Sequence, residues 1–181
     1  MRGYPARQSV LLACALVYTV RLSVTLLVFL KRRIPWWEGM IGIVAFPLLI
    51  FSFLRVGGGN DQPLGWVDGV GIALYLVGSY VGTASELARH LWKRKPENAG
   101  RLYTGGLFRR VRHVNYLGDL LLFTGFALIT DSTWMLGAPA VMASSFFTIV
   151  IPAHEAYLTA KYGRDFAAYA ARSKKLVPFI Y

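Results

Sequence analysis

Cysteine is almost absent from this 181-residue sequence, which contains only Cys14, placed inside an apolar run. A single cysteine has no partner within the chain. An intrachain disulfide framework and a cysteine-based zinc site are therefore both excluded. We interpret Cys14 as a packing residue.

Charged residues are also scarce. They form 16% of the sequence against 55% for hydrophobic residues, and the mean hydropathy is +0.45. Soluble domains typically contain about 25% charged residues. This composition excludes an ordinary soluble globule and indicates an integral membrane protein.

Acidic residues are the rarer sign of charge, with 9 Asp and Glu against 20 Lys and Arg, so the net charge is +11. A basic chain suggests nucleic acid as one possible partner. Here, however, the basic residues border apolar runs and do not cover a polar domain, which is the pattern of membrane orientation. We expect no nucleic-acid partner.

Five stretches are long and apolar enough to cross about 30 Å of hydrocarbon as helices. They are residues 8–30, 36–54, 66–88, 114–130 and 133–153. The first is longer than a signal-peptide core and has no small-residue cleavage site before Lys31, so we expect a retained span. The sequence predicts an all-α fold, a polytopic membrane helix bundle of about five transmembrane helices in a single domain over residues 1–181.

Lys and Arg divide unequally between the two sides of this bundle. One side, with the N-terminus and the loops near 55 and 131, carries 3 of them, whereas the other side carries 16 at residues 31–33, 89–113 and the C-terminal tail. The positive-inside rule places the second set in the cytoplasm and the N-terminus outside.

The residues after the fifth span change character. Leu158, Tyr162, Phe166 and Tyr169 recur at intervals of three or four among charged residues, which predicts a cytoplasmic amphipathic helix over 154–172 with a bend at Gly163. The alternative is an interfacial anchor lying on anionic membrane lipid.

Polar residues at the start of the fourth span are candidates for function, since polar groups in a bilayer are expensive. Asn115 and Asp119 are four residues apart and share one face of a helix. The alternative for Asp119 is a favourable position at a helix N-terminus or a pair with Arg112.

A dense set of cations precedes that span and could converge on phosphates, which guanidinium groups bind in a bidentate manner. The set comprises Arg89, His90, Lys93, Arg94, Lys95, Arg101, Arg109, Arg110, Arg112 and His113. Arg112 and His113 differ from the others because they adjoin the buried stretch.

Two carboxylates border the same region, Glu86 at the end of span three and Glu155 after span five. Either could pair with arginines or accept hydrogen bonds from a ribose or an amine. His154, His113 and His90 have no His-Glu-x-x-His spacing, so we expect no metal site.

At these residues the chain resembles a superfamily of membrane enzymes that joins isoprenylcysteine carboxyl methyltransferases, phospholipid methyltransferases, sterol reductases and steroid 5-alpha-reductases. The resemblance covers about residues 86–181. It rests on Gly106-Leu107-Phe108, on Arg112-His113-Val114-Asn115-Tyr116-Leu117-Gly118-Asp119, and on Glu155, Lys161-Tyr162-Gly163, Phe166, Tyr169 and Val177-Pro178-Phe179-Ile180-Tyr181.

The segment from Arg112 to Asp119 resembles the sterol-reductase motif, Arg-His-x-Asn-Tyr-x-Gly-Asp, more than the methyltransferase motif, Arg-His-Pro-x-Tyr-x-Gly. The resemblance therefore implies NADPH as the cofactor. It implies cofactor contacts at Arg89, Lys93, Arg112, His113, Asn115, Tyr116, Asp119, Glu155, Tyr162 and Tyr169.

The reaction implied is reduction of a polarised carbon–carbon double bond in a lipophilic, steroid-like or isoprenoid substrate from the bilayer. Asn115 and Asp119 would orient the nicotinamide half, and Tyr116 or Tyr80 would serve as the acid.

The alternative is methyl transfer from S-adenosylmethionine, with His113, Tyr116 and Glu155 around the cofactor and catalysis by alignment. The short chain of about five spans is similar to small prokaryotic methyltransferases, so we expect a prokaryotic-type inner membrane. A third interpretation is a non-enzymatic scaffold. Gly78 and Gly82 could mediate close helix contact within one bundle or between subunits.

Overall fold

The computed structural model describes residues 3–29 and 36–178. Among these residues every regular element is helical, and the extended backbone forms one isolated parallel bridge between Val111 and Lys174. The predicted all-α fold is therefore confirmed. Residues 31–33, counted above as cytoplasmic cations, and residues 179–181 lie outside the described part.

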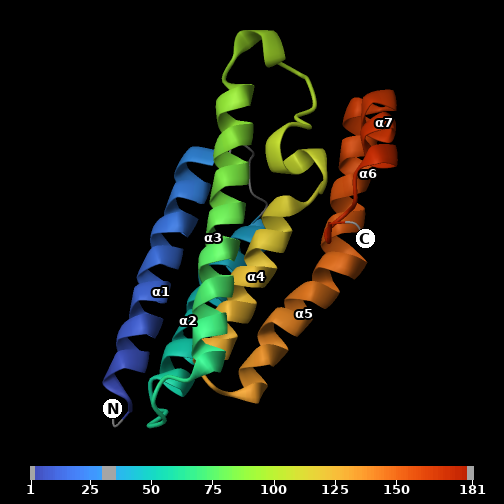
Figure 1. Cartoon of the computed structure of the whole chain (residues 1–181). Helices are drawn as coiled ribbons and strands as arrows, with labels where there is room; N and C mark the ends of the chain where they lie inside the picture. Colours follow the sequence, from blue (N-terminus) through green and yellow to red (C-terminus); the bar gives the residue numbers. More distant parts are fainter. Residues whose placement is uncertain (1–2, 30–35, 179–181) are drawn as a thin grey trace. The chain divides into compact units, whose positions relative to one another are not determined.

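The chain forms a series of long helices joined by short segments (Figure 1). They are α1 (Pro5–Val24) with the π-helical turn η1 (Thr25–Phe29), α2 (Trp36–Gly57), α3 (Trp66–Lys93) and α4 (Val114–Ile129). The segment between α3 and α4 contains two short 3₁₀ turns, η2 (Pro96–Asn98) and η3 (Gly106–Arg109). A last helical run joins η4 (Thr133–Leu136), α5 (Gly137–Ser145), η5 (Phe146–Val150) and α6 (Ile151–Tyr162), and α7 (Arg164–Arg172) follows.

Each predicted span coincides with an apolar helix. Pro5–Phe29, Trp66–Lys93 and Thr133–Tyr162 are long and apolar enough to cross a membrane, and Gly42–Gly57 and Val114–Ile129 are shorter apolar helices. Large apolar side chains are exposed at four-residue intervals along α1, at Leu12, Leu16 and Val20. Such a stripe suits lipid contact, and the membrane helix bundle is confirmed.

The fifth predicted span and the amphipathic helix predicted after it form one continuous helical run. The predicted span stops at residue 153, the predicted amphipathic helix starts at residue 154, and α6 passes through this boundary to Tyr162. No helix-breaking residue lies between these positions, so the change in polarity does not end the helix. Gly163, with φ +51°, ends it, and this confirms the predicted bend.

By its internal contacts the chain divides into two compact units. Unit 1 contains residues up to Leu76 and Leu122–Pro139, and unit 2 contains Val77–Leu121 and the residues from Ala140 onward. The single-domain assignment of the sequence analysis stays a prediction.

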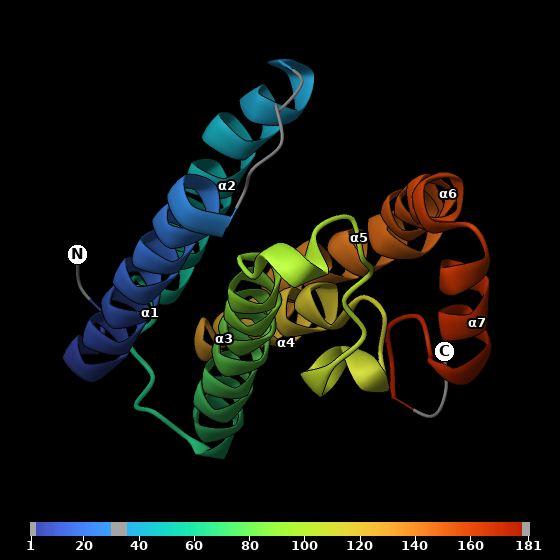
Figure 2. The same ribbon diagram turned by 90° about the horizontal axis from the view of Figure 1, so that it is seen from above.

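In unit 1, α1 and α2 run side by side (Figures 1 and 2) over an aromatic core. The rings of Phe53 and Phe126 are 4.8 Å apart and those of Tyr18 and Phe123 are 5.1 Å apart. These close ring pairs bury large apolar areas and hold α1, α2 and the end of α4 together.

Arg7 is fully buried at one end of unit 1. Its guanidinium donates to the Asp68 carboxylate at 2.6 and 3.1 Å and to the Ile129 carbonyl at 2.6 Å. Asp68 also accepts from the Gly65 backbone N–H at 2.7 Å, just before α3. One ion pair thus ties three distant parts of the chain.

In unit 2, glycines allow α3 and α4 to approach closely. A Cβ added at Gly118 would lie 2.7 Å from the Gly82 backbone nitrogen and 2.9 Å from the Gly78 carbonyl oxygen. The small-residue pair of α3 is therefore used within the chain, against α4.

Candidate functional site

The C-terminal tail pairs with the segment that precedes α4. The backbone N–H groups of Arg112 and His113 donate to the carbonyls of Lys174 and Lys175 at 2.8 and 2.9 Å, and Lys174 N–H donates to the Arg110 carbonyl at 2.9 Å. These bonds satisfy the backbone of an irregular segment. They also fix the start of α4 beside the tail.

Arg112 joins the tail to α6. Its Nε donates to Glu155 Oε1 at 2.8 Å, and its Nη1 donates to the Ala170 carbonyl at 3.0 Å and to the Ser173 carbonyl. The Arg112 side chain is only 7% exposed, so this charge is compensated in a place where water is largely excluded. Lys175 Nζ lies 3.7 Å from the other Glu155 oxygen.

His113 is almost fully buried against the same carboxylate. Its Nε2 lies 3.4 Å from Glu155 Oε1. Burial, assisted by the nearby charge of His154, lowers the pKa of His113 to about 4, against the opposing effect of Glu155. The neutral ring donates through Nε2, and Nδ1 has no hydrogen-bond partner among the described residues.

Tyr116 and His154 form a second polar contact near this network. The Tyr116 hydroxyl and His154 Nδ1 are 3.3 Å apart, and the Tyr116 ring stacks on Phe146 at 4.8 Å. The rings of His113 and Tyr116 are parallel at 5.4 Å. A phenol and an imidazole in hydrogen-bond contact can pass a proton between them.

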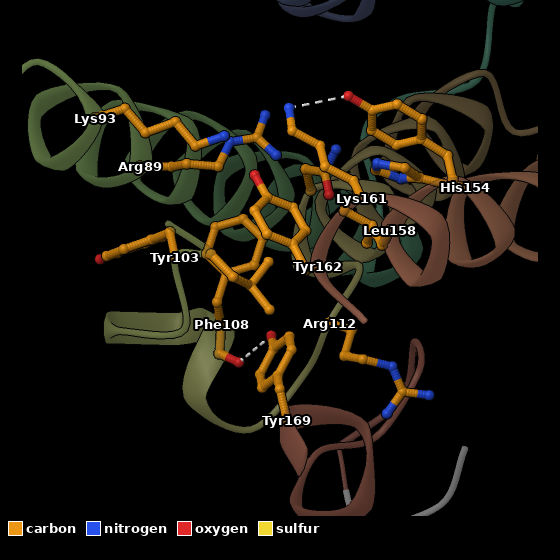
Figure 3. A pocket seen from close by; sticks show the side chains of 13 residues that line it. Arg89, Lys93, Tyr103, Phe108, Arg112, His154, Leu158, Lys161, Tyr162 and Tyr169 are labelled. Atoms are coloured by element: carbon orange, nitrogen blue, oxygen red, sulfur yellow. Dashed lines mark hydrogen bonds between the residues drawn. The ribbon is translucent and has the colours of Figure 1, made fainter. Parts of the chain in front are cut away.

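A cavity of about 110 Å³ opens beside His154 (Figure 3). Four cations line it: Arg89 and Lys93 from α3, Arg112 from the segment before α4, and Lys161 from α6. The lining also contains Asn115, His154, Leu102 and Leu158 and the rings of Tyr103, Phe108, Tyr157, Tyr162 and Tyr169. No carboxylate belongs to the lining that the described residues form.

The cavity wall is held by specific contacts. The Tyr169 hydroxyl donates to the Phe108 carbonyl at 2.6 Å, and burial raises the pKa of Tyr169 to about 12. Arg89 lies over the Phe108 ring at 5.6 Å and pairs with Glu86 at 2.5 Å. Lys161 Nζ donates to the Tyr157 hydroxyl at 3.1 Å. The wall is therefore preorganised.

The structure brings together many of the residues expected in the site. Arg89, Lys93, Arg112, Asn115, Tyr162 and Tyr169 all line the cavity. Figure 3 shows the Arg112 guanidinium directed away from the Tyr103 and Tyr162 rings. Its hydrogen bond to Glu155 accounts for this direction.

Other expected residues lie outside the lining. Three of them contact lining residues or each other. Glu155 accepts from the lining residue Arg112 and contacts His113, and Tyr116 contacts the lining residue His154. Asp119 lies one turn further along α4 than Asn115. Tyr80 is 72% exposed on α3. Their expected roles in cofactor binding and catalysis stay predictions.

Five polar or aromatic lining residues were not among the site residues expected from the sequence: Lys161, His154, Tyr157, Tyr103 and Phe108. The motif Lys161-Tyr162-Gly163 was a signal for Lys161, and the four-residue spacing of Tyr157 and Lys161 on α6 could have added the tyrosine. For metal, the described residues contain no group of three or more His, Cys, Asp or Glu that could hold an ion.

Comparison with protein families matches residues 38–173 to a family described as "Protein of unknown function (DUF1295)". Protein-S-isoprenylcysteine O-methyltransferase B of Arabidopsis thaliana is 30% identical over 120 residues, 64% of this chain and 61% of that protein. The 3-oxo-5-alpha-steroid 4-dehydrogenase 2 of Homo sapiens is 29% identical over 126 residues, 67% of this chain and 47% of that protein. The chain thus spans less than two thirds of either relative.

A solved structure of the eukaryotic intramembrane Ras methyltransferase, isoprenylcysteine carboxyl methyltransferase, has a similar fold. The TM-score is 0.60 at 18% sequence identity, and the match covers 92% of this chain and 63% of that chain. This likeness supports the membrane helical fold described above.

Proposed function

Since the chain belongs to the DUF1295 family, which spans the isoprenylcysteine methyltransferase and steroid 5-alpha-reductase branches, we propose that it is a membrane reductase that uses NADPH. The membership confirms the resemblance drawn from the sequence. The proposed reaction is reduction of a carbon–carbon double bond in a lipophilic, steroid-like or isoprenoid substrate.

The charge of the cavity lining carries this proposal. Arg89, Lys93 and Lys161 face one space without a lining carboxylate. Phosphate groups suit such a lining, since charge-assisted hydrogen bonds to guanidinium and ammonium groups are strong. S-adenosylmethionine would bring a sulfonium and an ammonium group against one carboxylate, so its net charge is less complementary to this lining.

Other lining residues offer contacts of the kinds that a nicotinamide dinucleotide uses. Aromatic faces at Tyr103, Tyr157 and Tyr162 suit stacking on a base, and Asn115 offers an amide to a carboxamide. When bound, NADPH would supply the hydride. The pair of Tyr116 and His154 would hold and move the proton that completes the reduction.

The membrane fold supports a proposal for the substrate route and for the orientation of the chain. We infer that the lipophilic substrate enters from the bilayer, that the cavity and the C-terminus face the cytoplasm, and that the N-terminus is outside. For Asp119 we propose the orienting role that the family resemblance implies.

Ligand-dependent thermal stability of the purified chain in detergent tests the cofactor. A ligand that binds only the folded protein raises its stability. We expect NADPH to raise the unfolding temperature more than NADH, S-adenosylmethionine or S-adenosylhomocysteine. Stabilisation by S-adenosylhomocysteine without stabilisation by NADPH would overturn the reductase assignment, and no stabilisation by any of the four would favour a scaffold.

Three variants that each remove one positive charge test whether NADPH binds in the cavity. Lys93→Gln and Lys161→Gln each remove one lining cation, and we expect each to weaken NADPH binding about tenfold. Lys95→Gln removes an exposed cation outside the lining and should leave NADPH binding unchanged. Equal effects of all three would assign the loss to overall charge.

Methyl transfer is the second candidate, favoured by the 30% identity to the Arabidopsis thaliana methyltransferase. In that reaction His113, Tyr116 and Glu155 would position S-adenosylmethionine, and catalysis would consist mainly of alignment. The same ligand comparison separates the two candidates.

A further inference from the structure

A second hollow, with a volume of about 490 Å³, lies in unit 2. Thr104, Arg109 and Arg172 line it. None of these three residues lines the cavity beside His154, so the hollow is a separate feature of the surface.

The backbone bridge accounts for the approach of the two arginines. Val111 pairs with Lys174 in a parallel bridge. Arg109 lies two residues before Val111, and Arg172 lies two residues before Lys174, so the two arginines have equivalent places in the paired segments. Arg109 ends η3 and Arg172 ends α7. Two segments distant in sequence thereby carry like charges to one hollow.

Neither guanidinium is compensated within the described part of the chain. Arg109 and Arg172 are exposed, and neither has a hydrogen bond or an ion pair with a described residue. Arg89 and Arg112, by contrast, each pair with a glutamate. Two nearby positive charges repel each other, and an anion between them would remove that cost.

We propose that this hollow binds the phosphate of an anionic phospholipid headgroup. Guanidinium groups bind phosphate in a bidentate manner, and the Thr104 hydroxyl can add a donor. The lining offers no aromatic ring to stack a nucleotide base, so the recognition is of the anion. Apolar helix α4 begins five residues after Arg109, which places the hollow at the level of the headgroups.

The test uses the full chain in neutral detergent, with phosphatidylglycerol, phosphatidylcholine or inorganic phosphate added at equal phosphate concentration. Phosphatidylglycerol should raise the unfolding temperature, whereas the other two should have little effect. In the variant Arg109→Gln/Arg172→Gln the apparent affinity for phosphatidylglycerol should fall about thirtyfold.

A matched control removes the same charge elsewhere. Arg94→Gln/Arg101→Gln changes two exposed arginines outside both cavities and should retain the response to phosphatidylglycerol. An unchanged response in the Arg109/Arg172 variant overturns the proposal. Equal stabilisation by inorganic phosphate overturns the choice of lipid, and equal stabilisation by phosphatidylcholine overturns the role of charge.

Native mass spectrometry gives an independent measurement on the unaltered chain. We expect one phosphatidylglycerol to remain bound after detergent removal, and phosphatidylcholine to be lost. Loss of both lipids at equal collision energy contradicts the proposal. The NADPH response of the Arg109/Arg172 variant should stay unchanged, which separates this site from the proposed cofactor cavity.

Discussion

Arg7 and Arg112 are enclosed cations that each meet a carboxylate and backbone carbonyls. The Arg7 side chain is 0% exposed and that of Arg112 is 7% exposed. An enclosed charge is costly when its partner is removed, because the remaining group stays desolvated and unpaired. Each arginine therefore stabilises the fold only together with its carboxylate partner, Asp68 for Arg7 and Glu155 for Arg112.

Arg112→Gln should lower the free energy of unfolding by about 3 kcal/mol, since Glu155 would lose its nearest cation and the Ser173 and Ala170 carbonyls would lose their donor. Adding Glu155→Gln to the Arg112→Gln variant should lower the free energy of unfolding by less than Glu155→Gln does in the wild type, because no unpaired carboxylate then remains. Denaturant unfolding of the four proteins in the cycle measures this coupling. Arg94→Gln, at an exposed position, serves as the control, and additive losses would disprove the coupling.

His113 gives the chain a pH-dependent stability. Its folded pKa of about 4 lies below the ordinary value of 6.5, so the unfolded chain binds a proton that the folded chain does not. The contribution of His113 to the free energy of unfolding should be fully present above pH 6.5. The free energy of unfolding should fall by up to about 3 kcal/mol as the pH decreases to 4. Unfolding temperatures of the wild type and His113→Gln between pH 4 and 7 measure this contribution.

The His113→Gln curve should be flatter than that of the wild type across this range. The control Arg94→Gln changes an exposed residue that is not a histidine and should retain the wild-type slope. Identical slopes for the wild type and His113→Gln would show that His113 does not cause the dependence.

At the scale of elements, α3 and α4 meet through glycines separated by seven residues, or two helical turns. Gly71 faces Gly125 in unit 1, and Gly78 faces Gly118 in unit 2. Residues seven apart share one face of a helix. The resulting stripe lets backbone lie directly against backbone.

Gly118→Ala should lower stability by about 1–3 kcal/mol, because the added methyl would meet backbone atoms of Gly78 and Gly82 that cannot rotate away. Gly69→Ala is the matched control on α3, since a Cβ there meets nothing within 4 Å, and it should be neutral or slightly stabilising. Thermal unfolding in detergent compares them, and equal unfolding temperatures would refute close contact at Gly118.

Helices were predictable from the sequence because apolar length is a local property. The five apolar stretches are helical where the structure describes them, and the helix of the fifth continues past residue 153 into the predicted amphipathic segment. Polarity changes there, but backbone conformation does not change until Gly163. A polarity boundary marks the environment of a helix and not its end.

Contacts between distant residues were much less predictable. Arg7 and Asp68 are 61 positions apart, and both resemble ordinary loop-flanking charges in the sequence. Arg112 appeared to be a phosphate-binding candidate, although its guanidinium contacts Glu155 and the tail. Tertiary structure decides such partners, and the resemblance located the region without revealing them.

At the scale of the whole molecule, the distribution of charge predicts orientation. The side with residues 89–113 and the C-terminal tail carries 16 Lys and Arg, and the other side carries 3. One of those three is Arg7, which the ion pair with Asp68 neutralises. On the other side, Arg89 and Arg112 are likewise paired, with Glu86 and Glu155, so the asymmetry persists when paired cations on both sides are left out.

Thiol labelling can test this orientation because Cys14 is the sole native cysteine. In a Cys14→Ser background, Asp61→Cys and Glu97→Cys place single thiols at exposed positions beyond the two ends of α3. With a charged reagent that cannot cross the membrane, intact right-side-out vesicles should label Asp61→Cys, and Glu97→Cys should react only after permeabilisation. The opposite pattern would reverse the orientation, and labelling of both in intact vesicles would show that α3 does not cross the membrane.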